Sequence, residues 1–150
     1  MSHLQYYCYK GFGEAKREEF WYSQAVRVGD RIECSGQGGW DPATSKIHAD
    51  LSDEFDQAFA NVDLALKQAG GRGWCQVYRV NMYVVDINEE AFVASVRNLR
   101  KWMPDHQPIL TFIGVKQLGL EGMRVEIEVV AHDEEGAKAA AAERSAKQSY

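Results

Sequence analysis

The apolar positions of this chain follow two periods, which divide it into strands and helices. In residues 123–131 (MRVEIEVVA) the odd positions are apolar, whereas Arg124, Glu126 and Glu128 stand at even positions. A period of two is typical of a strand with one buried face. In residues 51–69 apolar side chains recur every three to four positions, which predicts a helix with one buried stripe. The open question is whether the charged face of the strand is solvated or lines a cleft.

The remaining elements follow from the same patterns and from turn and capping residues. Further strands are predicted at residues 5–9, 23–28, 31–36, 77–85 and 109–115, and a second helix at residues 89–103. Gly29 and Asp30 fit a two-residue hairpin turn between the second and third strands. Asp50 or Ser52 can cap the first helix, and Asn88 can cap the second.

The order strand-strand-strand-helix-strand-helix-strand-strand predicts an α+β fold, with a mixed sheet and both helices on one face. The other face then carries apolar and aromatic side chains, and a homo-oligomer is the simplest way to cover them. The chain of 150 residues is long enough for one core. From Asp133 the sequence becomes alanine-rich and charged, which is typical of a short helix or a frayed tail. We therefore predict a domain over residues 1–132 and a tail over residues 133–150.

Composition and charge exclude several classes of protein. The formal net charge of -5 and the pI of about 5.4 argue against a nucleic-acid-binding surface. No apolar run approaches the ~20 residues of a membrane span, and the N-terminus lacks the pattern of a secretory signal. Three cysteines without a C-x-x-C motif are typical of reduced thiols. We therefore predict a cytoplasmic protein that binds neither nucleic acid nor membrane.

The residues that most often carry chemistry form no strong motif by themselves. The four histidines lie in unrelated segments without metal-ligand spacing, so we predict no metal site. The glycine clusters at residues 36–39 and 70–73 lack the Lys-Ser/Thr of a phosphate loop, and no cofactor is expected. Glu126 and Glu128 point to the same side of one strand. Taken alone, they fit a solvated face better than a catalytic site.

Four stretches, in this order, change that interpretation. They are YSQAVRVGDRIECSGQ (22–37), FDQAFANVDLALKQAGG (55–71), VYRVNMYVVD (77–86) and RVEIEVVA (124–131). Together they resemble the Rid (reactive intermediate deaminase) family, also called the YjgF family, over about residues 20–132. The resemblance implies a chorismate-mutase-like α+β fold and a homotrimer with clefts between subunits. The best-known members hydrolyse enamines and imines to ammonia and a keto acid, and some carry an endoribonuclease label.

The resemblance assigns roles to particular residues. The family tyrosine falls on Tyr22, which shapes the cleft, and the family S-G-Q turn falls on Ser35, Gly36 and Gln37, whose backbone lies near the ligand. The first glutamate of the E-I-E piece falls on Glu126, which in the family faces the cleft and positions or activates the attacking water. The resemblance thus favours a cleft wall for the charged face of the last strand.

The chain also departs from the family pattern. Imine-hydrolysing members have a P-x-R-[ST/C] motif whose arginine grips the substrate carboxylate, but here Leu110 stands at the arginine position, followed by Thr111. Val96 and Leu99 replace polar residues of the second helix, and Trp40 stands where many relatives have a smaller apolar residue. A charge-assisted hydrogen bond contributes about 1.5–3 kcal/mol. The expected substrate is therefore less polar than a small imino acid.

Three functions remain open. The first is a Rid-like hydrolase with Glu126 as base and with Tyr22, the S-G-Q turn, Trp40, Leu110 and Thr111 around the substrate. The second is a non-catalytic trimer that binds a metabolite or a protein, and the third and weakest is an endoribonuclease. Glu128 is expected to form a salt bridge with Arg79 or Arg124, and either arginine could replace the missing charge.

Overall fold

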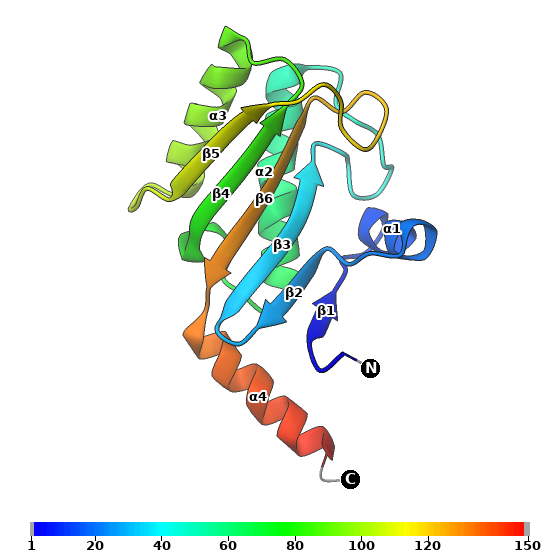
Figure 1. Ribbon diagram of the computed structural model, residues 1–150, viewed down its shortest axis with the longest axis vertical. Helices are drawn as coiled ribbons and strands as arrows, with labels where there is room; N and C mark the ends of the chain where they lie inside the picture. Colours follow the sequence, from blue (N-terminus) through cyan, green and yellow to red (C-terminus); the bar gives the residue numbers. More distant parts are fainter. Residues whose placement is uncertain (1, 149–150) are drawn as a thin grey trace.

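Six strands form one mixed sheet in the computed structural model, which describes residues 2–148 (Figure 1). The strands are β1 (Gln5–Tyr7), β2 (Ala25–Val28), β3 (Arg31–Gly38), β4 (Val77–Val84), β5 (Ile109–Gly114) and β6 (Val125–His132). Their order in the sheet is β1-β2-β3-β6-β4-β5. Only β4 and β5 pair in parallel, because the intervening helix returns the chain to the same end of the sheet.

The two long helices cover one face of this sheet. They are α2 (Leu51–Gln68) and α3 (Glu89–Trp102), which lie behind the strands in Figure 1. The side chain of Asp50 accepts a hydrogen bond from the backbone N–H of Asp53, and that of Asn88 accepts one from Ala91. These caps and the strand order confirm the predicted α+β fold with a mixed sheet and both helices on one face.

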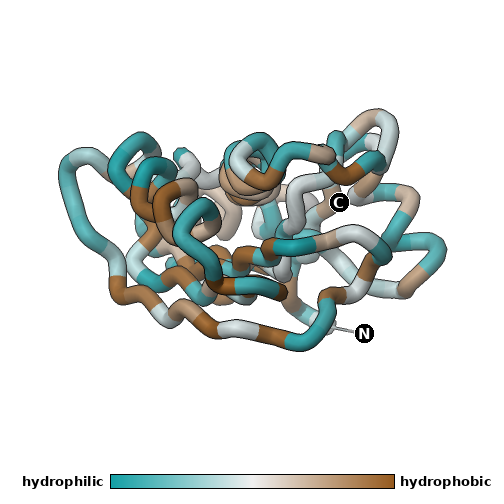
Figure 2. The backbone as a smooth tube through the Cα atoms, turned by 90° about the horizontal axis from the view of Figure 1, so that it is seen from above, coloured by the Kyte–Doolittle hydropathy of each residue, from teal (hydrophilic) through white to brown (hydrophobic). Residues whose placement is uncertain are grey.

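The core lies between the sheet and these helices, where Figure 2 shows hydrophobic segments in both layers. The alternation in β6 has the predicted consequence, since Val125, Ile127 and Val129 are buried against the helices. Phe59 of α2 stacks on Trp74 in the short 3-10 helix η1 (Trp74–Gln76), with the ring centroids 4.7 Å apart. Because the odd residues of β6 are buried against the helices, its even residues face the opposite side of the sheet.

On that opposite side, Glu128 accepts hydrogen bonds from the Asn81 amide (2.9 Å) and the Tyr83 hydroxyl (2.6 Å). Within residues 2–148 it pairs with no arginine, so the expected salt bridge is wrong. Arg124 instead donates its Nε to the fully buried carboxylate of Glu54 at 2.6 Å. A buried carboxylate is costly without a cation, which explains why Glu54 engages this arginine.

One helix, α1 (Phe12–Phe20), was not predicted, and of the two alternatives predicted for the segment from Asp133 the helix is the one observed. Helix α1 connects β1 to β2, and α4 (Glu134–Gln148) extends from the end of β6 away from the sheet (Figure 1). The predicted tail begins with a buried residue, because Asp133 pairs with Arg27 at 2.8 Å. The residues of α4 whose exposure is described are mostly exposed.

Candidate functional site

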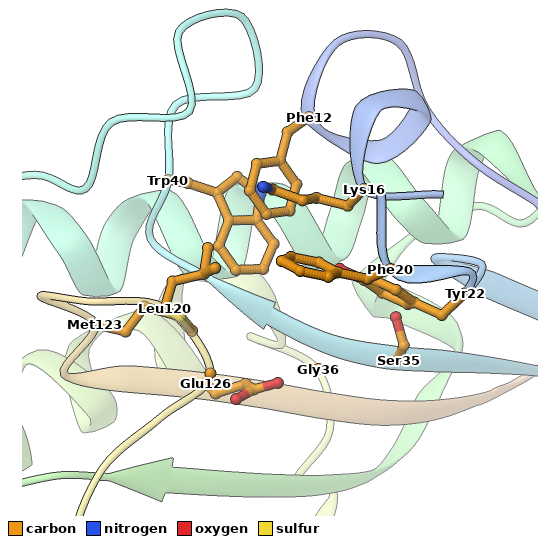
Figure 3. Close-up of a pocket in the computed structure, with 11 residues that line it drawn as sticks. Phe12, Lys16, Phe20, Tyr22, Ser35, Gly36, Trp40, Leu120, Met123 and Glu126 are labelled. Carbon is orange, nitrogen blue, oxygen red and sulfur yellow. The ribbon is translucent and has the colours of Figure 1, made fainter. Parts of the chain in front are cut away.

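A cavity of about 400 Å³ lies between α1, β3, β6 and the loop that joins β5 to β6 (Figure 3). Its lining residues are Phe12, Lys16, Phe20, Tyr22, Ser35, Gly36, Trp40, Gly119, Leu120, Met123 and Glu126. This volume falls within the range of roughly 300–1,000 Å³ that is typical of small-molecule sites. Most of the wall is apolar or aromatic, with a few polar groups.

Glu126 reaches the cavity from the even face of β6, where it stands opposite Gly38 in β3. Its carboxylate lies over the backbone of Gly36, because a Cβ added at residue 36 would lie 1.9 Å from Oε1. The pairing of β3 with β6 shifts register between Cys34 and Gln37, and such bulges are frequent beside functional sites. The glycine and the bulge together make room for the carboxylate.

The surroundings of Glu126 change its acidity. Burial raises the pKa of its carboxyl above the usual value, and the neighbouring charge of Glu128 raises that pKa further. Burial also raises the pKa of Tyr22 on the same cavity, so its hydroxyl remains a hydrogen-bond donor at neutral pH. A carboxyl with a raised pKa can both take up and return a proton, as general acid–base chemistry requires.

Buried hydrogen bonds fix the aromatic wall of the cavity on the side that faces away from the cavity. Trp40 stacks on Phe12 with ring centroids 3.9 Å apart, and its indole N–H donates to the Tyr9 hydroxyl at 2.9 Å. Tyr9 in turn donates to Gln37 Oε1 at 2.8 Å, and Gln37 Nε2 donates to Gln24 Oε1 at 2.7 Å. The side chain of Gln37 is therefore fully buried behind the wall and does not line the cavity.

Helix α1 supplies three lining residues that the sequence patterns missed. Phe12, Lys16 and Phe20 are spaced four residues apart, which places them on one face of the helix. The available signal was this F-x₃-K-x₃-F spacing within helix-forming sequence, directly before Tyr22. The stretch carries too few apolar residues for a periodic stripe, so it does not stand out as a helix.

The structure brings Tyr22, Ser35, Gly36, Trp40 and Glu126 together on this cavity. Leu110 and Thr111 lie elsewhere in the same chain, because β4 separates their strand from β6.

Leu110 pairs with Val80 and lines a separate depression, beside Val96, Leu99 and Arg100 of α3. Thr111 pairs with Asn81, on the face of the sheet that the helices leave uncovered. Within one chain, the predicted substrate-binding set is thus divided among the cavity, the buried space behind its wall, the depression at Leu110 and the uncovered sheet face.

The structure also bears on metal binding, on membrane-spanning helices and on the reactivity of Cys34. Among residues 2–148, no cluster of three or more His, Cys, Asp or Glu side chains has the arrangement of a metal site. Over the same residues no helix has the length and apolarity to cross a membrane. Burial raises the pKa of the Cys34 thiol, which keeps it protonated and a weak nucleophile.

The structure combines an α+β fold with a cavity of small-molecule size that the carboxyl group of Glu126 reaches. The family model for "Endoribonuclease L-PSP" matches residues 15–133. The chain therefore belongs to the Rid/YjgF family, as the resemblance of its motifs predicts.

Individual relatives support the same assignment. The chain is 32% identical to a 2-iminobutanoate/2-iminopropanoate deaminase of Dermatophagoides farinae, over 73% of this chain and 83% of that protein. It is 34% identical to a protein of the same name from Bos taurus, over 73% of this chain and 78% of that protein. The solved structure of protein YJGH superimposes with a TM-score of 0.77 at 25% identity, over 89% of this chain and 99% of that one.

Proposed function

We propose that this protein hydrolyses an imine or enamine, with Glu126 as the residue that moves the proton. The observation that carries this proposal is the half-buried Glu126 carboxyl with a raised pKa, held over Gly36 on a cavity of small-molecule size. The relatives named 2-iminobutanoate/2-iminopropanoate deaminase support this reaction class.

The reaction follows from these groups in two steps. Glu126 takes a proton from water as the oxygen adds to the C=N carbon, and passes that proton to the nitrogen, which gives a neutral carbinolamine. Glu126 then takes the hydroxyl proton of the carbinolamine and gives it to the nitrogen, so that the C–N bond breaks, the carbonyl forms and ammonia leaves. One imine and one water therefore give one carbonyl compound and one ammonia. An enamine enters the same sequence after a proton adds to its carbon.

We further propose that the protein works as a homotrimer. The uncovered sheet face and the exposed Ile109 and Ile113 on the edge strand β5 need a partner surface. Leu110 on the same strand is 45% exposed. In this homotrimer, the depression at Leu110 of one subunit would form a cleft together with the cavity of a neighbouring subunit.

The test uses imines that an amino-acid oxidase generates in the assay, with ammonia release as the measurement. The protein should accelerate release above the uncatalysed rate, and Glu126→Gln should reduce that acceleration by about a hundredfold, at the lower end of general acid–base effects. Glu33→Gln is a matched control, since Glu33 lies on the neighbouring β3 and does not line this cavity. Equal rates for Glu126→Gln and the unchanged protein would refute the role of Glu126.

The apolar wall supports one alternative, a trimer that binds a small molecule without reaction. That alternative predicts ligand binding with no acceleration of any imine. The family description also names an endoribonuclease, but RNA binding depends on cationic surface and the formal net charge here is -5. Ammonia release therefore separates the proposed enzyme from both alternatives.

A further inference from the structure

We infer that Lys16 binds the carboxylate of the substrate, and that the site accepts 2-imino acids with an aromatic side chain. The inference rests on the proposed function for the identity of the reacting C=N group. The anion site itself depends on the geometry of α1 and of the cavity.

Lys16 is placed unusually for a lysine. Its side chain is only 16% exposed, although lysine is among the most exposed residue types. The ammonium lies 4.7 Å from the centroid of the Phe20 ring and 5.7 Å from that of Phe12. Helix α1 thus directs this cation over two rings that line the cavity, not into solvent.

The ammonium retains hydrogen-bonding capacity for a ligand. Among residues 2–148 its one acceptor is the carboxylate of Glu19, at 2.5 Å, and that side chain is 55% exposed. An ammonium has three N–H donors. A ligand carboxylate can therefore bind to Lys16 while the pair with Glu19 persists, or can replace Glu19, which returns to water at little cost.

Charge in the cavity favours this position for the anionic end of the ligand. Lys16 and Glu126 enter the cavity from opposite walls in Figure 3, with the Phe20 ring between them in that view. A substrate carboxylate beside Glu126 would meet a like charge, whereas the same group beside Lys16 meets a cation. An imino acid with its carboxylate at Lys16 therefore directs its C=N bond toward Glu126.

The walls and the volume favour an aromatic side chain on that substrate. Phe20, Tyr22 and Trp40 line the space between the two charged groups, and planar rings stack favourably on such walls. A cavity of about 400 Å³ is larger than a three- or four-carbon imino acid needs. Phe20 is half exposed and is thus available to close over a bound ring.

The cation enters the cavity from α1, at the beginning of the segment that the family model matches. The match begins at residue 15, inside α1, so it includes Lys16 and Phe20 but not Phe12. Leu110, at the family arginine position, lines a different depression in this chain. Lys16 therefore supplies from α1 the positive charge that position 110 lacks.

The kinetic test compares Lys16→Met, which keeps the apolar stem and removes the charge, with Lys16→Arg, which keeps the charge. For the imine of phenylalanine, Lys16→Met should raise KM by about ten- to hundredfold with little change in kcat. Lys16→Arg should restore most of the affinity. Lys101→Met is the matched control, because Lys101 also lies over an aromatic ring, that of Trp102, but outside the cavity.

Two further substrates distinguish an anion site from a structural role. The imine of phenylacetaldehyde lacks the carboxylate, so Lys16→Met should slow its hydrolysis far less than it slows that of the phenylalanine imine. An equal loss on both substrates would overturn the assignment of Lys16. The imine of alanine should react at least tenfold less efficiently than that of phenylalanine, and equal efficiencies would overturn the aromatic preference.

A binding measurement keeps this inference separate from the proposed reaction. Phenylpyruvate, the keto acid product, should bind the unchanged protein and Glu126→Gln, and should bind Lys16→Met at least tenfold more weakly. Lys16→Gln provides a second neutral variant if Lys16→Met does not fold. If the protein binds phenylpyruvate through Lys16 but accelerates no imine, the hydrolase is refuted and the anion site stands. If phenylpyruvate does not bind, or binds equally without Lys16, the anion site is refuted.

Discussion

The carboxylate of Glu126 occupies the space that a side chain at Gly36 would need, since a Cβ at residue 36 would lie 1.9 Å from Oε1. The two residues come from neighbouring strands, β3 and β6, at the point where their register shifts. The absence of a side chain at Gly36 therefore allows the carboxylate of Glu126 to occupy this position.

Gly36→Ala should abolish most activity while the fold survives. The added methyl group displaces the flexible end of Glu126, not backbone, so we expect a loss of tenfold or more in kcat/KM with cooperative thermal unfolding retained. Kinetics and circular dichroism measure the two effects. Gly114→Ala is the control, because a Cβ there would meet Ile87 at 3.4 Å and the Val84 carbonyl at 4.0 Å, both ordinary contact distances. Full activity in Gly36→Ala would contradict the placement of Glu126.

Glu126→Gln should stabilise the protein at neutral pH while it removes activity. Burial and the charge of Glu128 raise the pKa of Glu126 in the folded state, so ionisation of this carboxyl opposes folding above that pKa. The melting temperature of Glu126→Gln should therefore exceed that of the unchanged protein near pH 7. The difference should disappear below the usual carboxyl pKa of 4.5, where both states are protonated. A constant difference at every pH would point to packing instead of charge.

Asp133 should have the opposite pH dependence. Burial raises its pKa, but hydrogen bonds from Arg27, Gln76 and the Gly136 N–H outweigh that effect and lower it below the usual 3.8. Because the pKa is lower in the folded state, the ionised carboxylate of Asp133 stabilises the fold above pH 3.8. This stabilisation is lost as the pH falls through the folded-state pKa. Asp133→Asn leaves Arg27 without its buried partner and should cost about 3–5 kcal/mol near pH 7. Denaturant titration measures the loss, and a loss below 1 kcal/mol would contradict the buried pair.

Most of helix α4 should be dispensable for folding. Its residues after Ala137 are largely exposed, and the contact of Arg144 with the His3 carbonyl is long, at 3.4 Å. Deletion of residues 138–150 retains Asp133 and Gly136, so we expect a melting temperature within about 2 °C of the full chain. A truncation before Asp133 removes the buried carboxylate and should lower it strongly. Equal melting temperatures for both truncations would show that Asp133 contributes nothing.

The proposed homotrimer predicts a particle of three chains of 16.9 kDa each. Ile113→Glu places a charge on the exposed edge strand and should weaken assembly, because a charge there is desolvated on contact with a partner. Glu121→Gln, in the exposed β5–β6 loop, is the control. Light scattering at micromolar concentration measures the mass, and a stable monomer of the unchanged protein would refute the trimer.

The sequence by itself determined the local order of the chain and the face on which the acid lies. The period of two in β6 fixes Val125, Ile127 and Val129 on the buried side, so Glu126 and Glu128 must face the other way. The caps at Asp50 and Asn88 follow equally from local chemistry, because each side chain bonds an N–H three residues later.

Only the tertiary structure decided which side chains meet around that acid. Leu110 is separated from Glu126 by the strand order, which no local period specifies. Gln37 lies behind the wall because Tyr9 and Trp40, far along the chain, provide its hydrogen-bonding partners. Lys16 lines the cavity because α1 packs Phe12 onto Trp40. These contacts join segments that are far apart in the sequence and meet only in the folded protein. Periodicity, in contrast, indicates only which side of one helix or strand a residue occupies.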